Sequence, residues 1–302
     1  MARGSDTEAL KSRIAVVAGM PRSGTTFLYH TLGAHPAMFV PFIKETDYFS
    51  VNHDLGPRWY LGLFREMLPH QVGFDISPSY FVYPSTPNRM LQFNRSMKVV
   101  LAIRDPAEFA TSLYCHLGNA AWRMPSFEAF IEHYEGKLGP SRVRLELRKN
   151  AVPKTLEAYR ETFGDKLLLY TFELFKKEPL SVLQAIESFV GVPHHFSENT
   201  FENVVINAAR RRNVKLFGYL VGQLKRRGRF AFITNLSMRR MLRSVREATD
   251  RMSKKDPLPE SIGQYPPEYM RTAEAAFADQ RTQIAKIFAD AQMQLGSGTP
   301  FP

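Results

Sequence analysis

The sequence predicts an α/β protein in which a central parallel sheet lies between layers of helices. Three short apolar runs, at residues 13–19, 97–103 and 166–172, are typical of strands buried on both faces. A segment with helical spacing of its apolar residues follows each of them. Because strands and helices alternate along the chain, parallel pairing is favoured. We therefore expect ligands beyond the carboxyl ends of the strands, where such sheets bind them.

Residues at the ends of the expected helices support this assignment. Asp105-Pro106 stops the second strand, and proline is favoured in the first turn of the helix that follows. Gly191 ends the helix that follows the third strand, a common role for glycine. The expected helices span about residues 25–32, 107–117, 179–192 and 267–292.

Composition and charge favour anionic partners. The chain has 302 residues, a net charge of +11 and a pI near 9.7, which suggests nucleotides, acidic glycans, nucleic acid or a membrane surface. A single cysteine, Cys115, excludes an internal disulfide and fits a reducing compartment. No apolar run resembles a signal peptide or approaches the ~20 residues of a membrane span. We expect a cytoplasmic protein.

The last third of the chain is strongly basic. Residues 208–246 contain twelve Lys or Arg and no Asp or Glu. They could form a solvated helical face or contact anionic lipid headgroups, at ~1 kcal/mol per cation near the surface. No helix-turn-helix or RNA-binding motif is present, so nucleic acid is not an expected partner. We expect one domain over 1–302, with an α/β core at 13–205 and a basic helical extension at 206–302.

The loop after the first strand, "GMPRSGTT" (19–26), has the features of an anion-binding site. Its glycines have the spacing of a phosphate-binding P-loop, but Thr25 stands where that loop has its lysine. Backbone N–H groups at the start of a helix bind anions, the hydroxyls donate, and the arginine adds a fixed positive charge. The predicted binding residues are Pro21, Arg22, Ser23, Gly24, Thr25 and Thr26.

A second motif follows the strand at 97–103. Arg104 lies at the end of this strand and Ser112 two helical turns further on, within reach of one phosphate. Together the two motifs resemble those of sulfotransferases that use 3′-phosphoadenosine 5′-phosphosulfate (PAPS). The resemblance implies a P-loop-like three-layer fold, 5′-phosphosulfate binding by the first loop and 3′-phosphate binding by Arg104 and Ser112. It implies no metal.

A third match, "KETDYF" (44–49), resembles the glycan-modifying branch of that family. There the glutamate is the catalytic base, so Glu45 would deprotonate the acceptor, Lys44 would lie near the sulfuryl group, and Arg22 would neutralise the leaving oxygen. His116, one helical turn after Ser112, is a rival base. Ile76 departs from the pattern, because the glycan branch has a lysine at this position.

The expected reaction is transfer of the sulfuryl group of PAPS to a hydroxyl or amine, on a carbohydrate or glycolipid, leaving adenosine 3′,5′-bisphosphate. Arg227, Gly228 and Arg229 resemble the basic loop that closes over the nucleotide in the family. A P-loop nucleotide kinase and a basic membrane- or anion-binding adaptor are the alternatives. The aromatic residues that could line an acceptor cleft or belong to the core are Tyr48, Phe49, Trp59, Tyr60, Tyr80 and Phe81.

Overall fold

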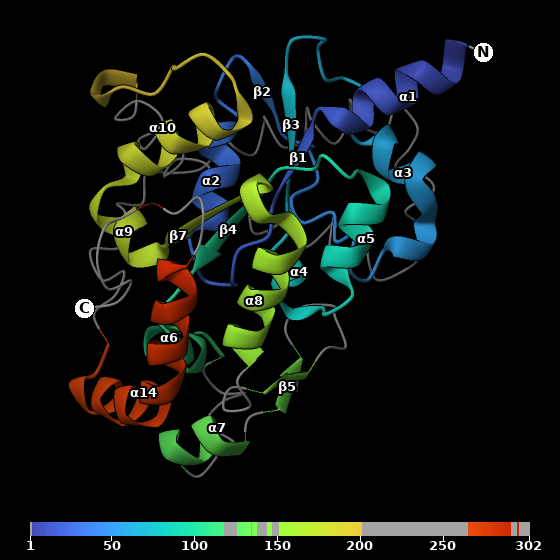
Figure 1. The fold of residues 1–302 in the computed structure, drawn as a ribbon. Coiled ribbons are helices and arrows are strands. Elements are labelled where there is room, and N and C mark those ends of the chain that lie inside the picture. Colours follow the sequence, from blue (N-terminus) through green and yellow to red (C-terminus); the bar gives the residue numbers. More distant parts are fainter. Residues whose placement is uncertain are drawn as a thin grey trace, which may run out of the picture.

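A five-stranded parallel sheet forms the centre of the protein (Figure 1). The structure, a computed structural model, describes residues 2–117, 126–133, 135–137, 144–146, 151–200, 265–290 and 295. The strands of the sheet are β1 (Ile14–Val17), β2 (Met38–Phe39), β3 (Val72–Ile76), β4 (Val99–Ile103) and β7 (Leu167–Thr171), in the order β2-β3-β1-β4-β7. A separate antiparallel pair consists of β5 (Glu135–Lys137) and β6 (Arg144–Glu146).

Helices cover both faces of the sheet, as predicted. The helices are α1 (Ala2–Ser12), α2 (Thr25–Leu32), α3 (Gly56–Gly62), α4 (Ser79–Val82), α5 (Thr86–Phe93), α6 (Pro106–Leu117), α7 (Phe127–His133), α8 (Ala151–Phe163), α9 (Phe172–Lys177), α10 (Pro179–Val190) and α14 (Pro267–Ala289). Short 3₁₀ helices span His53–Leu55 and Gly164–Lys166. The three predicted strands are β1, β4 and β7, and the predicted helix after β1 spans the expected residues.

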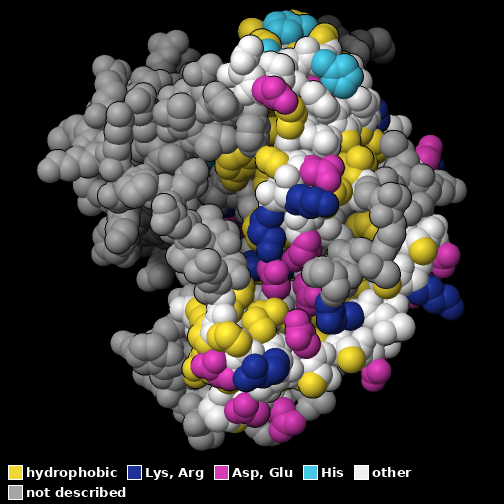
Figure 2. All heavy atoms as spheres, turned by 90° about the vertical axis from the view of Figure 1, so that its left-hand side faces the viewer, with side chains coloured by type: hydrophobic (Ala, Val, Ile, Leu, Met, Phe, Trp, Pro, Cys, Tyr) yellow, Lys and Arg dark blue, Asp and Glu magenta, His cyan; other side chains and the backbone are white. Residues whose placement is uncertain are grey.

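The predicted C-terminal helix, α14, packs on α6, α7 and α8. Its buried side chains belong to the same core as the sheet. The basic segment 208–246 lies outside the described residues. On the face shown in Figure 2, Lys and Arg side chains lie intermixed with Asp and Glu in one band, so the described surface there carries both signs of charge.

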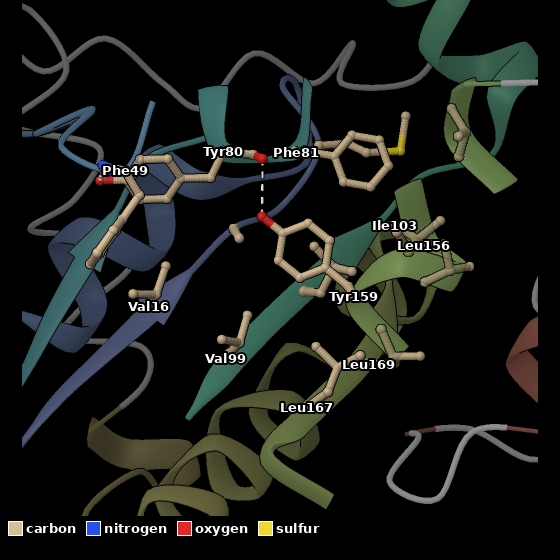
Figure 3. Packing of buried hydrophobic residues seen from close by; sticks show 14 of the residues in the cluster. Val16, Phe49, Tyr80, Phe81, Val99, Ile103, Leu156, Tyr159, Leu167 and Leu169 are labelled. Carbon is tan, nitrogen blue, oxygen red and sulfur yellow. Dashed lines mark hydrogen bonds between the residues drawn. The ribbon is translucent and has the colours of Figure 1, made fainter. Parts of the chain in front are cut away.

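The core has two layers because side chains alternate between the faces of each buried strand. Val99, Leu101 and Ile103 of β4 face a cluster that includes α6, α8 and α14, whereas Val100 and Ala102 face α2 and α10. Figure 3 shows the first layer, in which Tyr159 of α8 also donates a hydrogen bond to the carbonyl of Tyr80 (3.0 Å). These two layers make the protein a three-layer α/β fold.

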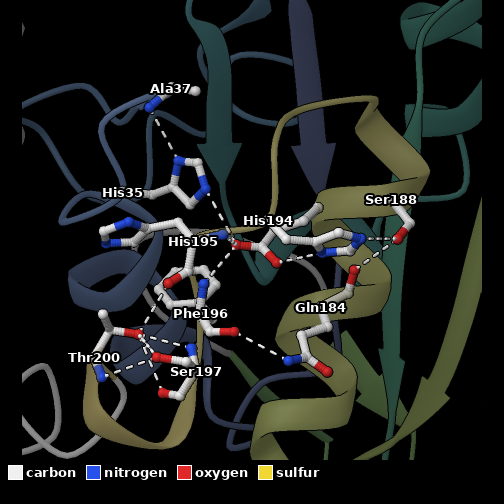
Figure 4. Close-up of polar contacts among 10 residues, drawn as sticks. His35, Ala37, Gln184, Ser188, His194, His195, Phe196, Ser197 and Thr200 are labelled. Atoms are coloured by element: carbon white, nitrogen blue, oxygen red, sulfur yellow. Dashed lines mark hydrogen bonds and ion pairs between the residues drawn. The ribbon is translucent and has the colours of Figure 1, made fainter.

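A network of polar groups closes the amino-terminal edge of the sheet (Figure 4). It centres on Glu187 near the end of α10, whose carboxylate accepts from the backbone N–H groups of His195 (2.8 Å) and Phe196 (2.9 Å). His194 Nδ1 lies 2.9 Å from Glu187 Oε2, and His35 Nε2 lies 3.2 Å from Oε1. The backbone N–H of Ala37 donates to His35 Nδ1, so His35 donates to Glu187 through Nε2. This network ties α10 to the turn before β2.

Candidate active site

The loop between β1 and α2 lies beside the end of β4. Strands β1 and β4 are direct neighbours, and pairing continues beyond β1, because the Met20 N–H donates to the Ala102 carbonyl (2.9 Å). At Gly19 a Cβ atom would stand 2.8 Å from the Ala102 Cβ, so only glycine fits this approach. Gly24 has φ +77°, a left-handed conformation that favours glycine. The two glycines of the predicted motif therefore shape the loop.

Strained backbone is concentrated in two candidate loops. Among the described residues, the non-glycine positions with positive φ are Arg22 (66°), Glu45 (62°) and Asp47 (52°). Such conformations cost about 1–3 kcal/mol each and persist where the surrounding structure holds them. They cluster at functional sites in proteins. Their presence beside two predicted catalytic side chains supports a function for both loops.

Arg104 connects the two anion-binding motifs. Its side chain is 3% exposed, and its Nη1 donates to the carbonyl of Arg22 (2.7 Å). Its Nη2 donates to Glu108 Oε2 (3.0 Å) and to the hydroxyl of Tyr265 (2.9 Å). The guanidinium also lies over the ring of Phe172, 4.9 Å from its centroid. Arg104 thus fixes the backbone of the first loop from the end of the next strand.

Two buried donors at this edge have no hydrogen-bond partner within the described structure. Ser23 is fully buried and its Oγ is unpaired. Arg104 Nε is unpaired as well. Leaving a buried polar group unpaired costs about 1–3 kcal/mol, so each atom indicates a missing partner. The unpaired atoms lie on the two loops predicted to bind anions.

The remaining predicted nucleotide-binding residues lie in the same loop or at the adjacent helices α2 and α6. Ser112 of α6 is 2% exposed, and Arg22 Nε lies 3.4 Å from its Oγ, so the two motifs meet directly. Thr25 is buried at the start of α2, Thr26 is exposed, and Pro21 is half-buried.

The predicted base and its neighbouring lysine lie in the loop after β2. Lys44 Nζ donates to Glu45 Oε1 at 2.5 Å, and both side chains are half-buried. The next residue, Thr46, donates to Asp75 Oδ2 (2.7 Å) near the carboxyl end of β3. Since β3 is the other neighbour of β1, this tether holds the Glu45 loop at the same edge of the sheet as the phosphate loop.

Buried hydroxyl groups keep the Glu45 loop in place. Asp75 accepts from Tyr80 (2.5 Å) and Ser77 (2.8 Å) in addition to Thr46. Ser79 donates to Asp47 Oδ1 (2.7 Å), one of the strained positions. Burial raises the pKa of Asp75, although the hydroxyl donors partly offset this effect. The loop is thereby preorganised around Glu45.

A carboxyl group with a raised pKa lies next to Arg104. Glu173, in the first turn of α9, accepts from the backbone N–H of Asp105 (3.4 Å). Burial, helped by the negative charge of Glu108, raises the pKa of Glu173 to about 7. Lys176 of the same helix donates to both oxygens of Glu108 (3.0 Å each). The surroundings of Arg104 therefore combine fixed positive charges with carboxyl groups.

The other predicted site residues either lie outside the described part of the structure or belong to the core. The rival base His116 lies in α6, but its side chain is outside what the structure describes, as are Arg227, Gly228 and Arg229. Ile76 is 3% exposed and belongs to the apolar layer against α2, so no cation enters the site from this position. The aromatic residues offered as an acceptor cleft are core residues, exposed by 6% or less: Tyr48, Phe49, Trp59, Tyr60, Tyr80 and Phe81.

The structure adds site residues that sequence reasoning missed. Glu108 lies one helical turn from both Arg104 and Ser112, so this spacing could have identified it. Tyr265 and Arg281 come from the far end of the chain, and Arg281 Nε pairs with Asp105 Oδ2 at 3.0 Å. No local pattern connects these two residues to the site.

Within the described residues, no group of three or more His, Cys, Asp or Glu side chains is arranged to hold a metal ion. No helix in this part of the protein is both long and apolar enough to cross a bilayer. Cys115, at the exposed side of α6, is a free thiol.

Comparison with known proteins agrees with the two loop motifs. The sulfotransferase domain family matches residues 13–228, which is more than half of the chain. The chain belongs to the sulfotransferase family. It is 26% identical over 212 residues to human heparan sulfate glucosamine 3-O-sulfotransferase 5, covering 65% of this chain and 57% of the relative. The mouse 3-O-sulfotransferase 3B1 is 26% identical over 190 residues, covering 62% and 48%. The chain thus spans about half the length of these curated relatives.

A solved structure shows the same fold. The sulfotransferase of Alicyclobacillus acidocaldarius has a TM-score of 0.51 and 22% identity, covering 64% of this chain and 89% of that one. This likeness confirms the predicted P-loop-like α/β fold. Membership of the sulfotransferase family agrees with the predicted enzyme class, a transferase. The nucleotide kinase alternative is not favoured.

Proposed function

We propose that this sulfotransferase moves the sulfuryl group of PAPS, the donor used by its family, to a hydroxyl group of a carbohydrate. The observation that carries the proposal is a pair of buried donors, Ser23 Oγ and Arg104 Nε, that lie on adjacent loops and have no partner among the described residues. PAPS has one anionic group at the 5′ position and another at the 3′ position, and therefore supplies one partner for each loop.

The residues present fit such a donor. Ser23, the N–H groups at the start of α2 and Arg22 would hold the 5′-phosphosulfate. Arg104 and Ser112 would hold the 3′-phosphate, with Arg227 and Arg229 as further predicted contacts. Because the leaving group has a single phosphate at its 5′ position rather than a polyphosphate chain, the proposal requires no metal bridge.

Glu45 is the proposed base that acts on the acceptor. Its carboxylate takes the proton of the acceptor hydroxyl, whose oxygen forms a bond to sulfur. The bond between sulfur and the bridging phosphate oxygen breaks, and the electron pair stays on that oxygen. A positioned base contributes about 10²–10⁴-fold. The Thr46–Asp75 tether supplies the positioning, and His116 remains the alternative base.

Charge develops on the leaving oxygen, and the phosphate loop stabilises it. The strained backbone of Arg22, which Arg104 holds through its carbonyl, presents a guanidinium that keeps its charge at any working pH. Lys44 adds a second cation beside the base. The lysine of the glycan branch is absent at Ile76, so these two side chains carry the stabilisation.

A carbohydrate hydroxyl is the acceptor that the relatives support, because their printed names describe 3-O-sulfation of glucosamine in heparan sulfate. An amine or a glycolipid hydroxyl is an alternative acceptor. Contact of residues 208–246 with anionic lipid would suit a lipid-linked acceptor. Co-sedimentation with vesicles that contain or lack anionic lipid tests this contact.

A transfer assay with radiolabelled PAPS tests the proposed reaction over a panel of glycans, glycolipids and phenols. We expect labelled product with a glycan, in the absence of magnesium. Arg22→Ala should lower turnover by about 10²–10³-fold, since it removes a donor to the developing charge. Arg22→Lys, which keeps the charge without the planar donors, should retain part of the activity. Wild-type turnover by Arg22→Ala would contradict the assignment of the loop.

A further inference from the structure

The C-terminal helix brings a tyrosine hydroxyl to Arg104. Tyr265 lies two residues before α14, and its OH accepts from Arg104 Nη2 at 2.9 Å. The same guanidinium lies 5.8 Å from the centre of the Tyr265 ring. Both the ring and the hydroxyl of this side chain therefore contact a residue that is 2% exposed.

Packing of α14 fixes this contact. Phe277, Ile284 and Phe288 are buried in the core layer that β4 shares. Arg281 of α14 pairs with Asp105, the residue that follows Arg104. Helix α14 thus contacts Asp105 through Arg281, and Tyr265, two residues before this helix, contacts the preceding residue, Arg104.

The two groups that share Arg104 Nη2 differ in what they can do with a phosphate. Glu108 pairs with both Arg104 and Lys176. As a carboxylate it can only accept hydrogen bonds, and it would repel an anion. A tyrosine hydroxyl accepts and donates at the same time. While Tyr265 accepts from Arg104, its own O–H remains available to a phosphate oxygen beside that arginine. Arg104 Nε has no hydrogen-bond partner among the described residues, so the arginine can still donate to such a ligand.

We propose that Tyr265 is a further binding residue for the nucleotide 3′-phosphate, accepting an N–H of Arg104 and donating its O–H to the phosphate. The inference rests on the proposed function, because it requires a nucleotide with a 3′-phosphate. It extends the nucleotide site from the α/β core to the C-terminal helix. Discrimination between nucleotides with and without this phosphate then depends on a residue about 160 positions beyond Arg104.

Calorimetry with two nucleotides tests the inference. Adenosine 3′,5′-bisphosphate carries the 3′-phosphate and AMP lacks it. We expect Tyr265→Phe to weaken binding of the bisphosphate roughly 10- to 100-fold, as for a lost hydrogen bond to a charged group. Binding of AMP should stay at the wild-type value. Tyr269→Phe is the matched control, since this tyrosine lies four residues further along and packs on Tyr114 and Phe127.

The outcomes separate the two proposals. Wild-type affinity of Tyr265→Phe for the bisphosphate would overturn the role of Tyr265 and leave the proposed function intact. An equal loss of both nucleotides would also overturn it, because a structural role affects both ligands. Equal binding of AMP and the bisphosphate by the wild-type protein would overturn the proposed function, and this inference with it. Thermal unfolding of each variant verifies that it is folded.

Discussion

Asp75 and Glu187 are both fully buried carboxylates, but they lie at opposite edges of the sheet and have opposite pKa shifts. Burial raises the pKa of Asp75, and its hydroxyl donors offset this only in part. Burial acts in the same direction on Glu187, but backbone N–H groups and His194 outweigh it and lower the pKa. The partners, rather than the depth of burial, decide which carboxylate is stabilised in its charged form.

The two edges also differ in their backbone geometry and in their polar contacts. At the amino-terminal edge, Glu187 accepts from two backbone N–H groups and contacts two histidine rings. At the carboxyl edge the backbone is strained at Arg22 and Glu45, and the buried Ser23 Oγ has no partner in the part of the chain that the structure describes. One edge therefore stabilises the fold, and the other is arranged for a ligand.

The largest expected effect is at the catalytic edge. Glu45→Gln keeps the size of the side chain but removes the base, so turnover should fall by about 10²–10⁴-fold. Affinity for adenosine 3′,5′-bisphosphate should not change, because Glu45 lies outside the nucleotide loops. Steady-state kinetics with the acceptor found in the transfer screen measure the effect. If His116→Gln causes this fall and Glu45→Gln does not, the histidine is the base.

At the opposite edge, a substitution should change stability alone. Glu187→Gln removes the charge that faces the backbone N–H groups of His195 and Phe196. We expect a loss of about 1–3 kcal/mol in the free energy of unfolding, with turnover unchanged below the unfolding transition. Urea denaturation measures the loss. A fall in turnover of the folded variant would show that the two edges are coupled.

Asp75→Asn is the matched substitution at the candidate site. It should reduce the free energy of unfolding by less than Glu187→Gln does. The hydroxyl partners of Asp75 can reverse their direction, and burial already disfavours its charge, so we expect under about 1 kcal/mol. Turnover should fall by about tenfold, because the Thr46 tether that positions Glu45 is weakened. Denaturation and kinetics on the same preparation compare the two carboxylates. A stability loss as large as that of Glu187→Gln would contradict the difference between the edges.

The smallest expected effect concerns pH. Burial lowers the pKa of His35 below 6.5, so the unfolded chain binds more protons than the folded protein at pH values below 6.5. The stability that His35 contributes is complete above pH 6.5 and is lost as the pH falls toward the folded-state value. His35→Gln should therefore flatten the change in Tm between pH 7 and pH 5. His70→Gln, at an exposed position, is the control for the substitution.

Local sequence patterns predicted the parts of the fold with strong periodicity. The strands at 97–103 and 166–172 are continuous apolar runs, and both are central to the layers of the core. Strand β2 has two residues, and β3 contains Gly73 and the buried Asp75, so neither resembles a buried strand. Their placement depends on pairing with neighbouring strands, which a local pattern does not contain.

The candidate site likewise contains residues that local motifs predict and residues that only the packing of distant segments brings in. Arg22, Ser23, Arg104 and Ser112 lie within two short motifs, and the structure brings these motifs together. Tyr265 reaches Arg104 only because α14 packs on α6, a contact between distant parts of the chain. The aromatic residues near Glu45 could not be assigned from sequence, since a buried ring and a cleft-lining ring have the same spacing. Their burial assigns them to the core.

We infer that the carboxyl edge of the sheet has two anion sites that bind one nucleotide. Isothermal titration of the wild-type protein with adenosine 3′,5′-bisphosphate and with AMP tests it most directly. We expect the bisphosphate to bind at least about tenfold more tightly, since its 3′-phosphate adds charge-assisted hydrogen bonds to Arg104 and Ser112. Equal affinity for the two nucleotides would contradict the account.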